Sequence, residues 1–453
     1  MNISNAIAAI ANFIWGWPLL GLLLGTHIFL TIRLKFIQRY IGKAIKLSFK
    51  KDIDSEGHIS QFSALATSLA ATIGTGNIVG VATAVSMGGP GAVFWTWITG
   101  VLGISTKYAE GLLAVKYRVR TKSGGYAGGP MYALEYGLNQ KTLAILFAFF
   151  TMIAAIACGS SIQANSITDA LNSSFGFNKA WVAAIVMVLA GSAMLGGIKS
   201  IARISNNLVP FMAVFYIISC LLILISGYEN ILSSIQLIIT AAFTKQAALG
   251  GFAGSTIMLA ARFGVARGLL SNESGLGSAP IIAAAAKTKN PVRQALVSSS
   301  GTFWDTVVIC AITGLVLVNT GVWNSGLKGI KLTQEAFNTI PFGSGMLSIS
   351  LIAFTFSTII GWSYYGEKCC EYLWGKKTII YFRIVYIVSI FFGGIFELDL
   401  VWNFGDISTG LMAFPNLIAL ILLSGVVVSE TKKYLWDKKL DDVSKDELKQ
   451  HRK

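Results

Sequence analysis

The sequence predicts an all-α membrane protein with about eleven transmembrane helices. Of its 453 residues, 54% are hydrophobic and 13% are charged, and the mean hydropathy is +0.65. Long apolar runs recur along the chain, each close to the ~20 residues that cross a bilayer. Lys and Arg gather in alternate loops, so the net charge of +15 reflects membrane orientation and predicts no nucleic-acid partner.

The apolar runs give the predicted spans in order. They are 5–31, 62–87, 91–116, 143–170, 180–196, 206–227, 255–286, 294–319, 345–373, 378–398 and 408–430. The first run lacks a basic start and a small-residue cleavage site, which favours a retained span over a signal peptide. The segment 230–248 is amphipathic, and we expect it at the outer surface, before the seventh span.

The distribution of Lys and Arg predicts the orientation of a multi-pass protein of the cell membrane. The basic segments are the loops 32–60, 116–142, 197–205, 286–294 and 368–383 and the tail from Lys432. The intervening loops hold few cations, namely Lys179, Lys245, Lys328 and Lys331. Because the basic segments fall on one side of the membrane, we expect the N-terminus outside and the C-terminus in the cytoplasm.

Two breaks inside apolar runs indicate a binding site. The residues GTGN at 74–77 interrupt the second span, and SGLG at 274–277 interrupt the seventh. Glycine loosens a helix, and backbone groups freed inside a bilayer are tolerated only where they line a cavity or meet a ligand. A kinked or closely packed helix is the alternative, because glycine is common in membrane helices. The pairing of the breaks favours the binding site.

The second break belongs to a weak internal repeat. The Phe-Trp pair at 94–95 is echoed by the pair at 303–304. Spans 2–6 then form one five-helix unit and spans 7–11 a second unit of inverted orientation. The predicted parts are an extra N-terminal span with a basic loop at 1–60, the repeats at 61–229 and 230–430, and a cytoplasmic tail at 431–453.

Two motifs resemble those of the alanine or glycine:cation symporters, also called the sodium:alanine symporter family. GGPGAVFWTWITGVLG at 88–103 is similar to the family signature, with Thr96 where the family pattern has Met. SNESGLGSAPI at 271–281 is similar to the second motif of the family. The family belongs to the amino acid–polyamine–organocation superfamily. The resemblance spans essentially the whole chain and implies a leucine-transporter-like five-plus-five inverted repeat, with the first span added in front.

The resemblance also implies a function. The implied function is secondary active symport: a sodium gradient drives the import of small neutral amino acids, alanine and glycine. Access to the binding site would alternate between the two sides of the membrane around two broken helices. A proton-coupled transporter of other small amino acids, a channel and an intramembrane enzyme are the alternatives. A channel needs a continuous polar lining. The sequence lacks GxSxG, HExxH and clustered His, so we expect no enzyme and no cofactor, with Na⁺ only as coupling ion.

An amino acid in the membrane needs N–H donors for its carboxylate and carbonyl oxygens for its ammonium group, and the two ends of a broken helix supply both. We expect the N–H groups of Thr75, Gly76 and Asn77 to bind the carboxylate. Carbonyls near Thr72 and Ile73 would accept from the ammonium. The further predicted substrate residues are Gln163, Ser271, Asn272, Ser274, Gly277 and Trp362. Close packing of small residues between helices is the alternative.

A sodium site is predicted at the ninth span. Phe354, Ser357 and Thr358 lie on one helix face at i, i+3 and i+4. The resemblance to leucine-transporter-type proteins implies that carbonyls of Ala70 and Ile73 complete the metal ligands. The alternative is that the hydroxyls bond to their own helix.

Trp362 follows Thr358 by about one helical turn. The resemblance places it beside the side chain of the substrate, where it would exclude substrates larger than glycine and alanine. A Trp that faces lipid or packs between helices is the alternative. Gln163 likewise either faces the substrate or makes an interhelical hydrogen bond.

Charged residues inside predicted spans need partners or functions. Lys107 and Glu110 lie three residues apart, and we expect them to pair. Asp305 lies in mid-span, with structural and ion-path roles both open, and Glu273 lies in the second break. The charges predicted on the outer side, as surface anchors or as a lid over the vestibule, are Arg262, Arg267 and Asp406.

Overall fold

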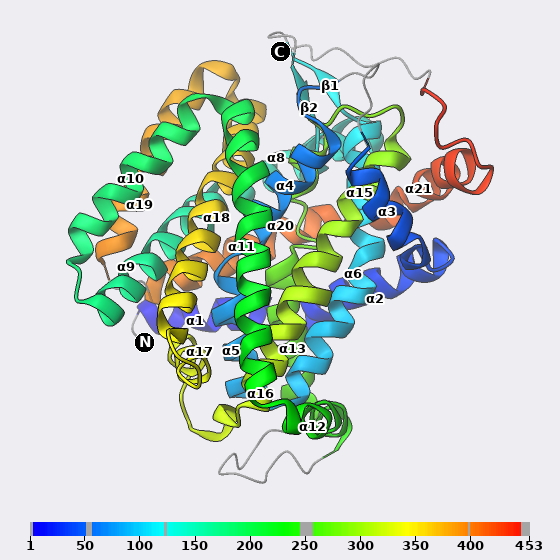
Figure 1. The fold of residues 1–453 in the computed structure, drawn as a ribbon. Helices are drawn as coiled ribbons and strands as arrows, with labels where there is room; N and C mark the ends of the chain where they lie inside the picture. The colour runs from blue at the N-terminus through cyan, green and yellow to red at the C-terminus, as the bar shows by residue number, and fades with distance from the viewer. Residues whose placement is uncertain (1–2, 51–56, 122–124, 245–256, 397–398, 445–453) are drawn as a thin grey trace.

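The molecule is built almost entirely of helices (Figure 1). The computed structural model describes residues 3–50, 57–121, 125–244, 257–396 and 399–444. Among these residues, seven helices are long and apolar enough to cross a membrane, or up to eight when the bent pair Gln61–Thr72 and Gly76–Gly88 counts as one span. The chain is therefore a multi-pass membrane protein.

Every predicted span of the first half coincides with helical structure. The elements are α1 (Ile3–Ile14), α2 (Trp17–Arg33), η1 (Ile37–Tyr40), α3 (Ile41–Ser48), α4 (Gln61–Thr72), η2 (Gly76–Gly80), α5 (Val81–Gly88), α6 (Gly91–Lys116), β1 (Val119–Arg120), β2 (Tyr126–Ala127), α7 (Pro130–Tyr132), η3 (Ala133–Gly137), α8 (Lys141–Ala154), η4 (Ala155–Ser161), α9 (Ile162–Phe175), α10 (Lys179–Leu195), α11 (Gly197–Ser226), η5 (Tyr228–Asn230) and α12 (Ile231–Phe243). The first span is found as one crossing at Ile7–Arg33, with an interruption between α1 and α2, because Pro18 near the start of α2 cannot continue the hydrogen bonding of α1.

The second half repeats this pattern of long and interrupted helices. Its elements are α13 (Ile257–Asn272), α14 (Pro280–Ala283), α15 (Pro291–Thr302), η7 (Phe303–Cys310), α16 (Ala311–Asn319), η8 (Val322–Asn324), α17 (Ile330–Phe337), α18 (Gly343–Trp374), η9 (Lys376–Thr378), α19 (Ile379–Ile395), α20 (Asp399–Leu422), α21 (Ser424–Thr431) and η10 (Lys432–Trp436). The predicted start of the last span at 408 is wrong, because α20 continues through the polar residues Asn403 and Asp406.

Parts of several predictions fall outside the described residues. They are 51–56 of the basic loop, 245–248 of the outer segment with Lys245, 255–256 of the seventh span, 397–398 of the tenth span and 445–453 of the tail.

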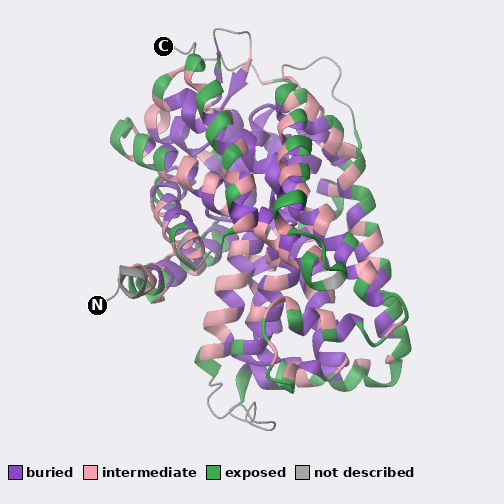
Figure 2. Ribbon diagram, turned by 90° about the vertical axis from the view of Figure 1, so that its left-hand side faces the viewer, coloured by how far each residue is buried: buried purple, intermediate pink, exposed green. Residues whose placement is uncertain are grey.

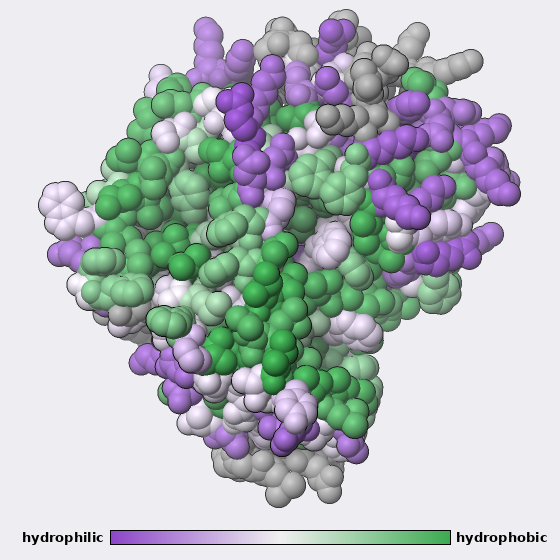
Figure 3. All heavy atoms as spheres, in the orientation of Figure 1, coloured by the Kyte–Doolittle hydropathy of each residue, from purple (hydrophilic) through white to green (hydrophobic). Residues whose placement is uncertain are grey.

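The predicted second span is broken as expected: α4 and the η2–α5 segment meet at an angle of 53°. Helix α13 packs along α5 and α6, while α18 packs against α4, α9 and α11. Figure 2 shows buried residues throughout the interior of this arrangement. Figure 3 shows a belt of apolar residues across the middle of the molecule, with hydrophilic residues gathered toward its upper end, as a bilayer requires.

The two Phe-Trp pairs adopt similar geometries. The rings of Phe94 and Trp95 meet edge-on at 5.7 Å and 88°, and those of Phe303 and Trp304 at 5.2 Å and 73°. Both pairs follow the first interrupted helix of their half. This similarity agrees with an internal repeat, and the repeat boundaries stay a prediction.

The end of the molecule that carries the basic loops is held closed by backbone contacts. Ile59, before α4, forms a parallel bridge with Ala286, after α14. The amide of His58 donates to the carbonyl of Ala285 at 2.8 Å. The antiparallel β1–β2 hairpin adds to this closure, because the amide of Tyr126 donates to His58 Nε2 at 3.0 Å. These contacts tie together the segments that lead into both helix breaks.

The protonation state of His58 decides whether this closure is complete. Its Nε2 accepts a hydrogen bond only when that nitrogen carries no proton. Burial lowers the pKa of His58 below the usual 6.5, and the surrounding cations lower it further: Lys368, Lys199, Lys287 and Arg118. Because the folded-state pKa is lowered, the neutral form stabilises the fold fully above pH 6.5, and this stability is lost as the pH falls below that value.

We therefore predict that thermal stability falls as the pH is lowered from about 8 to about 5. The variant His58→Gln keeps an acceptor that does not titrate in this range, so its melting temperature should depend less on pH. Thermal unfolding of both purified proteins across that range measures the difference. Equal pH dependence in the two proteins would show that His58 does not control the closure.

Candidate functional site

A cavity of about 310 Å³ lies beside the first helix break. Its wall is formed by the residues around the break between α4 and α5, by η4 and α9, by the last turns of α13, by Glu273 and Leu276 of the second break, by α18 and by α20. Small-molecule pockets typically measure about 300–1,000 Å³. The cavity is therefore sized for a small ligand, and it lies where paired breaks in the sequence predict a binding site.

The structure brings five of the ten predicted substrate residues to this cavity. They are Thr72, Thr75, Gly76, Gln163 and Trp362. The other five lie elsewhere among the described residues: Asn77, Ser271, Asn272, Ser274 and Gly277. Their substrate contacts stay predictions, and the hydrogen bonds described below occupy several of their polar groups.

The first break exposes backbone groups at the cavity. Helix α4 ends at Thr72, the backbone of the following Ile73 is extended, and the chain resumes as a helix after Thr75. Asn77 spans the gap, because its Oδ1 accepts from the amide of Gly74 at 2.9 Å and its own amide donates to the carbonyl of Gly74 at 3.3 Å. Of the three predicted carboxylate donors, Thr75 and Gly76 line the cavity.

Gln163 presents an unsatisfied acceptor to this cavity. Its Nε2 donates to the hydroxyl of Thr75 at 3.2 Å and to the carbonyl of Cys158 at 3.1 Å. Its Oε1 is buried and has no hydrogen-bond partner among the described residues. A buried acceptor left unpaired costs about 1–3 kcal/mol. A ligand with N–H donors would remove that cost.

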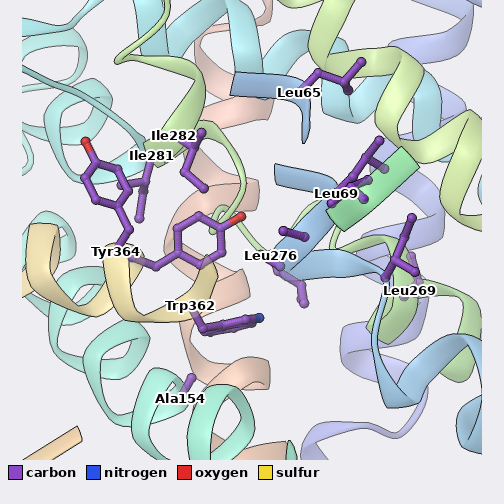
Figure 4. Close-up of a cluster of buried hydrophobic side chains, with 14 of the residues drawn as sticks. Leu65, Leu69, Ala154, Leu269, Leu276, Ile281, Ile282, Trp362 and Tyr364 are labelled. Carbon is purple, nitrogen blue, oxygen red and sulfur yellow. The ribbon is translucent and has the colours of Figure 1, made fainter. Parts of the chain in front are cut away.

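Trp362 closes one side of the cavity. The side chain is only 4% exposed, and its ring meets that of Tyr365 edge-on at 5.4 Å. A Cβ on Gly159 would lie 2.4 Å from Trp362 Cβ, so only glycine permits this approach. Glu273, from the second break, lines the cavity together with Trp362. Figure 4 shows the ring edge directed toward the side on which Leu276 lies.

Asp305 joins the two broken helices. Its Oδ1 accepts from Asn77 Nδ2 at 2.8 Å, and its Oδ2 accepts from Ser271 Oγ at 2.9 Å. Thr306 Oγ1 donates to Oδ2 at 2.6 Å. These donors are neutral, and the carboxylate is fully buried. The side chains of Asn77 and Ser271 therefore turn from the cavity toward η7.

A second carboxylate holds the second break. Glu110 Oε1 accepts from the amides of Gly275 and Gly277 at 3.0 and 3.1 Å and from Asn416 Nδ2 at 2.7 Å. Both glycines have positive φ, +91° and +88°, which L residues rarely adopt. The predicted Lys107–Glu110 pair is wrong as a contact, because Lys107 Nζ has no hydrogen-bond partner in the described chain.

Residues between these glycines and α13 bond mainly to one another. Asn272 Nδ2 donates to the carbonyl of Gly268 at 2.8 Å, and its Oδ1 accepts from the amide of Ser274 at 2.9 Å. The hydroxyl of Ser274 lies 3.0 Å from that of Thr302. Glu273 has a φ of +55° and accepts from Ser278 Oγ. The second break is thus largely satisfied by the protein itself.

The hydroxyls of the two predicted sodium ligands Ser357 and Thr358 bond within their own helix, which is the alternative to an ion site, and their binding of sodium stays a prediction. Thr358 Oγ1 donates to the carbonyl of Phe354 at 2.9 Å and also lies 3.3 Å from the carbonyl oxygen of Ile73, across the break. Ser357 Oγ donates to the carbonyl of Phe354 at 2.8 Å and lies 3.5 Å from the sulfur of Met212 on α11. Ala70 is fully buried on α4, one turn before Ile73.

The charges predicted on the outer side separate into two groups. Arg267 and Asp406 both line the cavity. Arg262 instead lies over the ring of Phe263, at 5.6 Å from its centroid. Trp402 also lines the cavity. Sequence reasoning missed it because the predicted last span began after it.

We predict that Glu110→Leu destabilises the protein by about 3 kcal/mol or more, because two buried amides and the Asn416 side chain lose their acceptor. Glu110→Gln retains an acceptor oxygen at the same distance along the side chain, so this variant should lose much less stability. Thermal unfolding of both purified variants measures the difference. A leucine variant as stable as the glutamine variant would contradict the role of Glu110 in holding the break.

Comparisons with known proteins give the relatives of this chain. The model of the family described as sodium:alanine symporter family matches residues 1–449. The chain is 50% identical to the sodium/alanine symporter AgcS of Methanococcus maripaludis, over 96% of this chain and 98% of the relative. It is 38% identical to the probable sodium/glutamine symporter GlnT of Bacillus subtilis, over 99% of this chain and 95% of that relative.

Among solved structures, the chain is similar to MhsT in complex with L-phenylalanine. The TM-score is 0.59 at 15% identity, and the match covers 85% of this chain and 95% of MhsT. This likeness shows the fold alone, and it confirms the predicted leucine-transporter-like arrangement of helices.

Proposed function

The chain belongs to the sodium:alanine symporter family, and from this premise we propose that it is a secondary active symporter that imports small neutral amino acids, alanine and glycine, with sodium. The observation that carries the proposal is the cavity of about 310 Å³ at the first helix break. It combines backbone groups of a broken helix with a buried, unsatisfied amide oxygen.

The polarity of the break matches a zwitterion. The C-terminal end of α4 directs carbonyl groups into the gap, whereas the segment that starts at Thr75 begins with N–H groups. In this proposal the amides of Thr75 and Gly76 bind the carboxylate. The ammonium group lies near the carbonyl of Thr72 and donates to Gln163 Oε1, which lacks a partner among the described residues.

Sodium would bind beside the substrate. Thr358 Oγ1, the carbonyl of Phe354 and the carbonyl of Ile73 converge at the point where α18 meets the break. Hydroxyl and carbonyl oxygens suit a hard cation. The peptide that joins Ile73 to Gly74 then lies between the proposed ion and the proposed substrate. This position supports coupling of the two.

The proposed orientation has the N-terminus outside and the C-terminus in the cytoplasm, because the basic loops lie at one end. The Ile59–Ala286 bridge then closes the cytoplasmic side. Arg267 and Asp406, at the cavity, lie toward the outer side. Release of the substrate inside requires this bridge to open, which is the movement expected of inverted repeats 61–229 and 230–430.

Uptake into proteoliposomes tests the function. Purified protein is reconstituted, and uptake of labelled alanine, glycine, glutamine and leucine is measured with a sodium gradient, with a proton gradient and with neither. The proposal expects saturable, sodium-dependent uptake of alanine and glycine. Uptake driven by protons alone would favour the proton-coupled alternative, and flux without saturation would favour a channel.

The first prediction from this site concerns sodium. Thr358→Ala removes one oxygen ligand and should raise the sodium concentration for half-maximal uptake at least about fivefold. Thr355→Ala is the matched control, because the hydroxyl of Thr355 bonds to carbonyls of its own helix, whereas that of Thr358 also approaches the carbonyl of Ile73 at the break. Sodium titrations of alanine uptake compare the two. An unchanged half-maximal sodium concentration in folded Thr358→Ala protein would refute the ion site.

The second prediction concerns substrate size. Trp362→Ala should admit valine or leucine and weaken alanine binding, since overfilling such a pocket costs about 1–3 kcal/mol, or about 5- to 150-fold in affinity. Trp374→Ala is the control, because Trp374 lies on the same helix and is 57% exposed. Competition of each amino acid against labelled alanine gives the preference. A folded Trp362→Ala protein with the parental size preference would overturn this assignment.

A further inference from the structure

A second hollow, of about 990 Å³, lies at the basic end of the molecule. Its walls come from η1, α3 and the segment after α21, with the start of α15 at its base. We name it the basic groove. Its seven basic side chains are Lys35, Arg39, Lys43, Lys50, Arg293, Lys432 and Lys438, and its two acidic ones are Asp437 and Asp441.

The acidic residues do not neutralise this groove. The carboxylate of Asp441 accepts from buried Arg293 at 2.6 Å and from Lys50 at 3.4 Å. The Arg293 hydrogen bond holds the pKa of Asp441 below its usual value, so the carboxylate stays ionised. Lys43, Lys432 and Lys438 are exposed and have no anionic partner among the described residues. The groove therefore keeps an excess of positive charge.

The groove borders an amphipathic helix and two exposed aromatic side chains. In helix α3, Ala44 and Leu47 are buried, while Lys43 and Lys46 face outward. The helix packs against α15, so its charged face is the one left to the surroundings. Phe36, before η1, is 62% exposed, and Phe49, after α3, is 70% exposed. Figure 3 shows hydrophilic residues over the α3 region directly beside the apolar belt.

We propose that the basic groove binds the phosphate-bearing headgroup of an anionic phospholipid. The lysines supply the charge for the phosphate, and the exposed Phe36 and Phe49 give the acyl chains an apolar path to the belt. A free phosphate would match the charge but not the apolar rim. In the proposed orientation the lipid belongs to the cytoplasmic leaflet, which carries anionic lipid.

Lipid in this groove would hold the C-terminal segment in place. Asn290, which caps α15, donates through Nδ2 to the carbonyls of Leu440 and Asp442, both at 2.9 Å. Lys35 lies over the ring of Trp436, 4.8 Å from its centroid. A headgroup that contacts both Lys43 and Lys438 bridges α3 and this segment. We therefore expect bound lipid to raise thermal stability. This inference does not depend on the transported substrate.

The test uses the purified full chain in neutral detergent. Phosphatidylglycerol or phosphatidylcholine is added, and bound lipid is counted by native mass spectrometry while unfolding is followed on heating. The proposal expects phosphatidylglycerol to bind and stabilise, and phosphatidylcholine to do so far less. The double variant Lys43→Gln/Lys438→Gln should bind phosphatidylglycerol at least about tenfold more weakly.

The matched control is Lys46→Gln/Lys439→Gln. Lys46 lies on the same helix as Lys43, and Lys439 is the neighbour of Lys438; both are exposed, and neither lines the groove. The two double variants carry the same net charge. Equal loss of phosphatidylglycerol binding in both would therefore overturn the proposal that the groove is a defined lipid site. Equal binding of the two lipids by the parent protein would also overturn it, as would stabilisation by inorganic phosphate as strong as that by phosphatidylglycerol.

Discussion

The carboxylate of Asp305 is the contact on which the centre of this molecule depends. It accepts hydrogen bonds from Asn77 of the first break and from Ser271, near the second. A buried carboxylate is tolerated only when donors surround it, so these side chains cannot turn elsewhere without cost. Their attachment fixes the position of the two interrupted helices and, with it, the backbone of Thr75 and Gly76 at the cavity.

The two breaks then differ in what they leave available. In the second break, the amides of Gly275 and Gly277 are taken up by Glu110, and the Asn272 side chain bonds within its own segment. In the first, the only side chain that bridges the gap is that of Asn77, as far as the described residues show. This difference explains why the free backbone groups at the cavity belong to the first break, although Glu273 and Leu276 of the second break also line it.

Hydropathy and glycine placement predicted most of the helices and the first break, because these depend on local composition. The motifs at 88–103 and 271–281 indicated the family. Glycine placement and the family resemblance together placed Thr75, Gly76, Gln163 and Trp362 near the site. Sequence reasoning did not predict that Asn77 donates to Asp305, that Glu110 accepts from the amides of the second break, or that Trp402 lines the cavity. Spacing along one helix gives the residues that share a face, but the rotation of that face toward its neighbours depends on packing between distant segments. Lys107 shows this limit: its spacing suggests a pair with Glu110, yet the carboxylate of Glu110 binds backbone amides of the second break.

Gly74 approaches α18 so closely that an added Cβ would lie 2.5 Å from Thr358 Oγ1. In the proposed sites, the peptide group that joins Ile73 to Gly74 offers its carbonyl oxygen to the cation and lies next to the groups that bind the amino acid. Binding free energies linked in this way are reciprocal, so whatever the cation adds to amino-acid affinity, the amino acid adds to cation affinity. The close contact at Gly74 would then link the two binding equilibria, so a side chain added at this position would disturb the cation site and the amino-acid site together.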